Sequence, residues 1–400
     1  MLLQVLLVFC FALSSCSAAS EKLKVLHEWK YLDFQFDSEE QRNRYIQSGD
    51  FQKNASIAID VDQAPDGRVF VTIVRQKGVP ASLVTVTDRM GDGGPLLRPY
   101  PDWSWVNGSC KGIVNVYRIF IDRCHHMWVL DTGVFGNDQV CPAQLLLFNL
   151  KNDQLIKRVV IPDKYARNAN GTGLLVTPVV HYQRQPCRSP AVFMADVEGY
   201  GLVIWDSLTK SIWRVESETF RPTPGKEEFV IAGTRFVLAD GILGMALNEN
   251  GTKYLFYKAL ASEYMYRTPV QKLLHTLRKK ETRFPFEQIS GSLPSQSAAQ
   301  AFSRDDVLFF GLTESTSIGC WNKNMEPIGS HTGVIARNNE TLQFASGVKV
   351  INTCMAEKLW VLTNRFQRFY TGTMNFDETN MRILVGDVHQ LIAGTICQRT

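Results

Sequence analysis

Six segments of the chain share a strongly apolar run, and they recur at a nearly constant interval. They are RVFVTIVR from Arg68, MWVLDTG from Met127, AVFMADVEG from Ala191, KYLFYKAL from Lys253, VLFFGLTE from Val307 and LWVLTNRF from Leu359. Successive starts lie roughly 50 to 65 residues apart, an interval that in a strand-rich chain is typical of propeller blades. The pattern therefore predicts six copies of one β-unit.

A second kind of strand precedes each apolar run. Its copies are rich in small residues: SIAIDVD, GIVNVYRIFID, a weaker copy near GLLVTPVV, DGILGMALN, SAAQAFS and SGVKVIN. Small residues suit strands that converge on a crowded axis. We therefore expect an all-β six-bladed β-propeller with a central ligand channel, each blade having an inner strand, the apolar strand and a third strand. A β-sandwich is the alternative, but its strands need not recur as triplets at one period.

Four segments lie outside this unit. Residues 24–36 alternate like a strand that could complete the last blade, and residues 37–51 could form one or two helical turns. The Pro- and Trp-rich stretch 96–105 is expected to cross between blades as a loop. The basic stretch 273–283 suggests a short helix or loop, with a solvated face as the default and contact with a polyanion as the weaker alternative.

The composition and the first residues bear on the compartment. Residues 1–19 have an apolar core followed by small residues, which predicts a cleaved secretory signal and a single domain over 20–400. We expect a secreted, extracellular protein without a membrane span. Five sequons begin at Asn54, Asn107, Asn170, Asn250 and Asn339 and are candidate glycosylation sites. A net charge of +4 argues for no nucleic-acid partner.

The cysteines support an oxidising compartment. Nine occur, and loss of Cys10 and Cys16 with the signal leaves seven. Three disulfides and one free or intermolecular thiol are the simplest account, and no CxxC pair points to zinc or redox chemistry.

Catalytic signatures are few. The chain has no HExxH, GxSxG, Walker or GxGxxG motif. Cys124, His125 and His126 are adjacent, but neighbouring residues point to opposite sides of a strand, so we expect a surface turn rather than a metal site. Asp60, Asp122 and Asp240 are expected at strand ends, where Asp most often bonds the backbone of a turn. We expect no metal and no cofactor.

Ligand binding in a propeller is centred on the channel mouth, where the inner strands converge. The candidates there are Ser295, Gln296, Ser346, Asn364 and Phe366, with Asp240 as a further carboxylate. An amide beside an aromatic ring suits a flat ligand with polar edges, and a protonated amine would gain a cation–π contact. The alternative is that Asn364 only caps a strand and Phe366 belongs to the core.

Several long motifs together resemble the insect yellow and major royal jelly protein family over essentially all of the mature chain. They are IVNVYRIFIDRCHHMWVLDTG (113–133), YGLVIWD (200–206), DGILGMAL (240–247), LFFGLTE with GCWN (308–322) and LWVLTNRFQ (359–367). The resemblance implies a secreted six-bladed propeller. It also implies disulfides Cys124–Cys187 and Cys320–Cys397, after which Cys110 and Cys141 could form a third, leaving Cys354 as the odd thiol.

The resemblance implies more than one function. Salivary members of blood-feeding flies bind serotonin and catecholamines, and the Asn and Phe of their NxF motif match Asn364 and Phe366. Other members take part in cuticle melanin formation, some as dopachrome-converting isomerases, and bee members are nutritional or signalling proteins. We therefore expect a monomeric binder of a small aromatic amine or catechol, linked to pigmentation or amine scavenging. The alternatives are a dopachrome isomerase, whose general base is not evident, and a structural or signalling protein without ligand.

Overall fold

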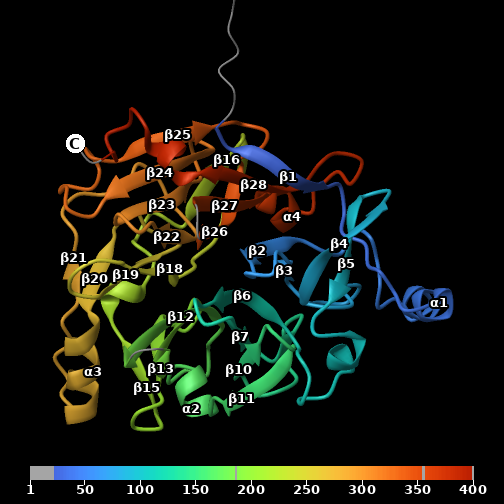
Figure 1. Cartoon of the computed structure of the whole chain (residues 1–400), viewed down its shortest axis with the longest axis horizontal. Helices are drawn as coiled ribbons and strands as arrows, with labels where there is room; N and C mark the ends of the chain where they lie inside the picture. Colours follow the sequence, from blue (N-terminus) through green and yellow to red (C-terminus); the bar gives the residue numbers. More distant parts are fainter. Residues whose placement is uncertain (1–21, 185–186, 354–355, 399–400) are drawn as a thin grey trace, which may run out of the picture.

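The computed structural model of the chain describes residues 22–184, 187–353 and 356–398. The predicted signal segment 1–19, with Cys10 and Cys16, and the odd cysteine Cys354 lie outside these residues. Six four-stranded antiparallel sheets are arranged around a common axis as the blades of a propeller (Figure 1). The predicted six-bladed all-β fold is confirmed.

Each blade is built from inner to outer strand in chain order, except for the last. Blade one comprises β2 (Ala58–Gln63), β3 (Val69–Ile73), β4 (Leu83–Gly91) and β5 (Gly94–Pro99). Blade two comprises β6 (Val116–Ile121), β7 (His126–Asp131), β10 (Gln144–Asn149) and β11 (Gln154–Val160). Blade three comprises β12 (Leu175–Arg184), β13 (Arg188–Asp196), β14 (Gly201–Asp206) and β15 (Ser211–Glu216). Blades four and five comprise β18 (Ile242–Leu247), β19 (Tyr254–Ala259), β20 (Tyr266–Pro269) and β21 (Glu287–Gln288); and β22 (Gln300–Phe302), β23 (Val307–Leu312), β24 (Ser317–Asn322) and β25 (Gly333–Arg337).

Blade six closes the ring with both ends of the described chain. Its strands are β26 (Phe344–Asn352), β27 (Glu357–Asn364), β28 (Met381–Asp387) and, outermost, β1 (Lys24–Trp29). Trp29 is fully buried and its indole Nε1 donates to the carbonyl of Pro95 in blade one at 2.7 Å. The predicted completion of the last blade by the N-terminal strand is therefore confirmed.

The sequence pattern missed the fourth, outer strand of the blades. The stretch 96–105, predicted as a crossing loop, contains most of β5 and the short 3-10 helix η1 (Trp103–Val106). Outer strands have one exposed side, so they lack the continuous apolar signature of the inner layers. In β11, for example, no residue is fully buried, and Ile156 is 51% exposed.

Helices and two small hairpins decorate the propeller. The helices are α1 (Glu39–Gln47), α2 (Asp163–Ala166), η2 (Glu218–Phe220), α3 (Val270–Lys279), α4 (Phe366–Tyr370) and α5 (Val388–Ile392). The hairpins are β8 (Val134–Phe135) with β9 (Asp138–Gln139), and β16 (Glu228–Ile231) with β17 (Thr234–Val237).

Helix α3 corrects the prediction of a solvated basic segment in one respect. Its charged side is exposed, but Leu273, Leu274 and Leu277 are buried against blades three and four. The 3.6-residue spacing of these leucines places them on one face of the helix.

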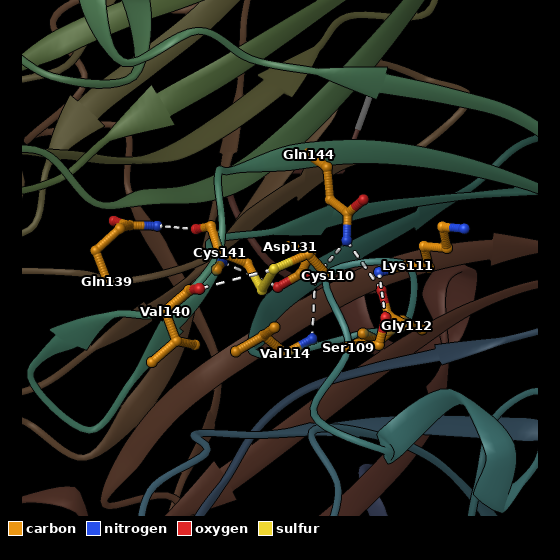
Figure 2. The surroundings of a disulfide bond; sticks show 12 residues. Ser109, Cys110, Lys111, Gly112, Val114, Asp131, Gln139, Val140, Cys141 and Gln144 are labelled. Carbon is orange, nitrogen blue, oxygen red and sulfur yellow. Dashed lines mark hydrogen bonds between the residues drawn. A yellow bond between two sulfur atoms is a disulfide. The ribbon is translucent and has the colours of Figure 1, made fainter.

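Three disulfides are present, and all three pairs follow the expected connectivity: Cys110–Cys141, Cys124–Cys187 and Cys320–Cys397. Figure 2 shows that the first ties the loop before β6 to the loop before β10, next to the buried carboxylate of Asp131. The cysteine of the Cys124-His125-His126 run is thus a disulfide partner. Asp122 accepts from the backbone N of Cys124 at 2.7 Å and of His126 at 3.0 Å, which confirms the predicted turn.

The five sequon asparagines, Asn54, Asn107, Asn170, Asn250 and Asn339, are all exposed outside regular strands. Their glycosylation stays a prediction. No helix among the described residues is long and apolar enough to cross a membrane.

Candidate functional site

The site is organised by irregularities at the start of the inner strands. Five inner strands carry a register shift near their first residues, between Ala58 and Asp60, Val116 and Ile119, Leu175 and Thr177, Ile242 and Gly244, and Ala345 and Gly347. A β-bulge turns a side chain away from the regular alternation and is common beside functional sites. All five shifts lie near the beginning of an inner strand, so they occur at the same end of the propeller.

Asn364 and Ser346 are brought together at this end. Asn364 is the last residue of β27, and its Nδ2 donates to the Ser346 hydroxyl at 3.0 Å and to the carbonyl of Ala58 in blade one at 2.7 Å. Its Oδ1 is buried and has no hydrogen-bond partner among the described residues. An unpaired buried acceptor costs free energy, so this atom is a candidate contact for a ligand.

The equivalent residues of blades two and three are fully engaged. Asp131 ends β7 and accepts from the backbone N of Val114 at 2.9 Å and of Asn115 at 2.8 Å. Asp196 ends β13 and accepts from the backbone N of Leu174 at 2.6 Å and from Arg214 at 2.7 Å. A polar residue at this position therefore ties strands together. Asn364 does so through its Nδ2 alone, and its Oδ1 takes no part.

Phe366 belongs to a group of aromatic residues that come from separate parts of the chain. It begins α4 and stacks on Phe344 with ring centroids 5.0 Å apart, and the ring of Phe236 meets it edge-on at 5.9 Å. Phe344 and Phe236 share one apolar cluster with Val176, Leu243 and Ala298, which come from or adjoin the inner strands of blades three, four and five. Phe366 packs against this cluster and is half-buried.

The hairpin β16–β17, which we call the cap hairpin, covers this group. In the sequence it lies between blades three and four, yet in space it reaches blade six (Figure 1). There the Tyr370 hydroxyl donates to the carbonyl of Val237 at 3.2 Å. Gln296 holds its base, since its Nε2 donates to the carbonyls of Lys226 at 3.1 Å and Glu228 at 2.9 Å. The structure thus places Gln296 beneath the cap hairpin, and Ser295 is buried beside it.

Asp240 lies between the cap hairpin and β18. Its carboxylate accepts no hydrogen bond from the described residues, and it is half-buried. Burial raises the pKa of Asp240 to about 7, the nearby charge of Glu198 raises it further and that of Arg118 lowers it. Asp240 therefore does not hold a turn through its side chain, contrary to the prediction from its place in the sequence.

Several charged side chains reach from one blade to a carbonyl or a carboxylate of another blade. Asp60 lies within β2 and pairs with Lys349 of β26 at 2.9 Å, so the prediction that it holds a turn is also wrong. Arg118 of β6 is 4% exposed and donates through Nη2 to the carbonyl of Ser346 at 2.7 Å. Lys258 of β19 is fully buried and donates through Nζ to the carbonyls of Ser297 and Ala298.

Sequence reasoning did not select Arg118, Lys258 or Lys349. A signal for two of them exists, because a single cation interrupts the apolar runs VYRIFI and YLFYKA. A cation inside a strand that is otherwise apolar in sequence is unusual and marks a candidate functional residue.

Elsewhere in the described chain, few features suggest another functional site. No group of three or more His, Cys, Asp and Glu side chains within residues 22–184, 187–353 and 356–398 could hold a metal ion. A cavity of about 340 Å³ lies at the rim of blades one and two, lined by Pro65, Asp66, His125, Leu150 and Lys151. None of the residues predicted to bind ligand lines it.

Comparison with known proteins defines the family. Residues 114–397 match the family model described as Major royal jelly protein. Major royal jelly protein 9 of Apis mellifera is 40% identical over 385 residues, covering 94% of this chain and 90% of that protein. Major royal jelly protein 8 of the same species is 39% identical over 394 residues, covering 94% and 93%.

Solved structures share the architecture alone. An α-L-arabinanase of Penicillium chrysogenum, complexed with arabinobiose, superposes with a TM-score of 0.52 at 8% identity, covering 92% of this chain and 99% of that one. An identity this low supports the propeller fold and carries no function. The family model over residues 114–397 and the bee relatives, which cover 94% of the chain at about 40% identity, do more. This chain belongs to the major royal jelly protein family.

Proposed function

We propose that the protein is secreted and binds a small aromatic amine, such as dopamine, serotonin or a related catechol, at the end of the channel below the cap hairpin. The observation that carries this proposal is the buried, unpartnered Oδ1 of Asn364, next to the stacked rings of Phe366 and Phe344. In blades two and three the matching carboxylates are satisfied by backbone and side-chain donors. Asn364 therefore has a free acceptor where its counterparts have none.

The surrounding residues suit such a ligand. A ring hydroxyl or amine would donate to Asn364 Oδ1, and the aromatic ring would stack against Phe366. A protonated amine over an aromatic face gains roughly 0.5 to 2 kcal/mol. Ser346, Gln296 and Asp240 lie around the same channel end, and an ionised Asp240 would attract a cationic ligand to the mouth.

Calorimetric titration of the purified protein with dopamine and serotonin tests the proposal. We expect saturable binding and a loss of about tenfold or more in affinity for Asn364→Ala, because the ligand then lacks its buried acceptor. Asn43→Ala, at an exposed position of α1, is the matched control and should bind as the wild type does. Equal affinity of Asn364→Ala and wild type would assign Asn364 to strand tethering alone.

A second candidate is the dopachrome isomerase, favoured by the pKa of Asp240. Removal of a proton from carbon needs a general base that is partly unprotonated at neutral pH. A carboxylate with a pKa of about 7 at a channel mouth meets that need, which no sequence motif did. The base would take the proton, and its conjugate acid would return it to the isomerised product.

The isomerase reading is tested by dopachrome decay in the presence of the protein. Acceleration above buffer that is lost in Asp240→Asn at saturating dopachrome would support catalysis by Asp240. Decay at the rate of the buffer would reject the isomerase. If dopamine and serotonin also failed to bind, the structural or signalling role would be favoured.

Secretion is supported by three disulfides, which persist in oxidising compartments. Mass spectrometry of the protein from the culture medium of expressing cells should show an N-terminus near residue 20 and glycans on some of the five sequons. Retention inside the cells, with residues 1–19 still present, would contradict this part of the proposal. A monomeric mass in sedimentation would agree with the expected monomer.

A further inference from the structure

Helix α3 has a basic face on the side opposite to the face that it buries. Lys272, His275 and Lys279 follow the i, i+3, i+7 spacing that places side chains on one side of a helix, and all three are exposed. Leu273 and Leu277 are buried on the other side, against blades three and four. The helix runs along the outside of these blades (Figure 1), so its basic face is directed at solvent.

The chain after the helix extends this positive charge. Lys280, the C-cap residue, and Arg283 are both exposed. Residues 270–283 contain five Lys and Arg residues but only one acid, Glu281. Arg278 is neutralised, because its Nη2 lies 2.7 Å from a carboxylate oxygen of Asp206 in β14. The other four cations form no ion pair with any residue that the structure describes.

Two arginines of blade three adjoin the C-terminal end of α3. Arg278 Nη2 also donates to Gln183 Oε1 of β12, and the next residue, Arg184, is exposed. Arg184 pairs in register with the exposed Arg188 of β13, and neither forms an ion pair within the described chain. We call the exposed cations of this surface the basic rim: Lys272, Lys279, Lys280, Arg283, Arg184 and Arg188.

The stability of the fold does not account for the basic rim. Acidic residues stabilise the first turn of a helix and basic residues the last turn. Helix α1 follows this rule, with two glutamates in its first turn and Arg44 in its last, whereas α3 has no acid in its first turn and carries Lys272 there. Like charges that stand opposite each other in a sheet, as at Arg184 and Arg188, are also unfavourable. These arrangements cost stability, as expected of a surface that binds an anion.

We propose that the basic rim binds a linear sulfated polysaccharide. Lys272 and Lys279 are about 10 Å apart along the helix axis, so a chain with anionic groups along its length contacts cations that one small anion cannot span. Lys and Arg side chains form charge-assisted hydrogen bonds with such groups. A lipid surface is disfavoured, because the leucines of α3 are buried and cannot insert into it. A nucleic acid is disfavoured, because α3 has no Phe, Tyr or Trp on which bases could stack.

The basic rim is separate from the candidate site for the amine. Arg184 is the last residue of the inner strand β12, whereas Ser346 lies near the beginning of the inner strand β26. The inner strands of a propeller run in the same direction, so the two residues lie toward opposite ends of it. The polysaccharide proposal therefore goes beyond the proposed function, and Asn364→Ala should bind the polysaccharide as the wild type does.

Binding to immobilised heparin tests the proposal. We expect saturable binding by the full-length mature protein in about 50 mM salt and a loss of affinity of about tenfold or more in about 0.5 M salt, because salt screens exposed charges. The triple variant Lys272→Gln, Lys279→Gln and Arg283→Gln should bind about tenfold or more weakly than the wild type. All three positions are exposed, so the fold should tolerate the changes.

The matched control is the triple variant Lys24→Gln, Lys30→Gln and Lys358→Gln, which removes the same charge from exposed lysines in and beside the strands of blade six. It should bind heparin as the wild type does. Equal losses in the two triple variants would overturn the basic rim, because binding would then follow net charge alone. Absence of heparin binding by the wild type would also overturn it. Tighter binding to phosphatidylserine vesicles or to a single-stranded oligonucleotide than to heparin would overturn the choice of a polysaccharide.

Discussion

Asp240 has a pKa of about 7, above its ordinary value of 3.8, because its carboxylate is partly withdrawn from water and the charge of Glu198 is nearby. An acid whose pKa is raised on folding binds its proton more tightly in the folded state. Its protonation therefore stabilises the fold at low pH, and this stabilisation is lost as the pH rises from about 4 to about 7. Asp62 in β2 has a pKa raised in the same way to about 7.

We expect Asp240→Asn to remove the contribution of this carboxylate to the pH dependence of stability. The amide is neutral at every pH, so the variant should gain stability relative to the wild type as the pH rises from about 5 to about 8. Urea unfolding at the two pH values measures the difference. Asp37→Asn, at a carboxylate that is mostly exposed, is the control and should show little change of this kind. A difference that falls with rising pH would contradict the raised pKa.

Asn364 shows what the sequence could and could not say about single residues. Its place after the LWVLT run allowed the alternative that it ends a strand, and it is the last residue of β27. Its pairing could not be predicted, since its main partner is the carbonyl of Ala58, 306 residues away in the sequence. The same holds for Arg118 and the carbonyl of Ser346, which are 228 residues apart.

The cap hairpin is the element that the repeat pattern did not predict. Its four-residue strands are too short to stand out in the sequence, and only alternate residues of them are buried. Phe229, Ile231 and Phe236 face the propeller, whereas Val230 and Val237 are 40% and 61% exposed. The hairpin therefore depends on its contacts with blade six, because two short strands alone are marginal in water.

Phe236→Ala should loosen the cap hairpin without unfolding the blades. The ring stacks on Phe229 with centroids 5.1 Å apart and meets Tyr370 at 5.4 Å, so its removal leaves a cavity that costs roughly 3 kcal/mol or more. We expect trypsin to cleave several-fold faster at Arg235, which is exposed on the hairpin. The readout is limited proteolysis followed by mass spectrometry.

Val237→Ala is the matched control for this variant, because its side chain lies on the outer face of the same strand. It should be cleaved at the rate of the wild type. Equal cleavage of Phe236→Ala and wild type would show that other contacts, such as those of Gln296, are sufficient to hold the hairpin.

At the scale of the whole molecule, the chain ends close the ring. Strand β1 completes blade six, and Cys397, beyond α5, is bonded to Cys320 in blade five. The closure joins segments that are hundreds of residues apart in the sequence, so these segments separate when the chain unfolds. A covalent link there restricts the unfolded ensemble more than a link between near neighbours.

Replacing the pair Cys320 and Cys397 by alanine should lower the free energy of unfolding by about 4 kcal/mol, because the sequence separation is 77 residues. Replacing Cys110 and Cys141, which are 31 residues apart, should cost somewhat less. Chemical denaturation of both double variants makes the comparison. A larger loss for the shorter loop would show that local strain or packing outweighs chain entropy.

The sequence by itself determined the number of blades, the positions of the inner and second strands, and the family to which the chain belongs. These follow from local patterns that repeat along the chain, such as the apolar run at Leu359 and its five counterparts. Only the tertiary structure decided that the outer strands exist as fourth strands, that a hairpin caps the channel, and which polar atoms remain unpaired. These depend on contacts between distant residues, because a buried charge such as Lys258 is defined by what surrounds it and not by its neighbours in sequence.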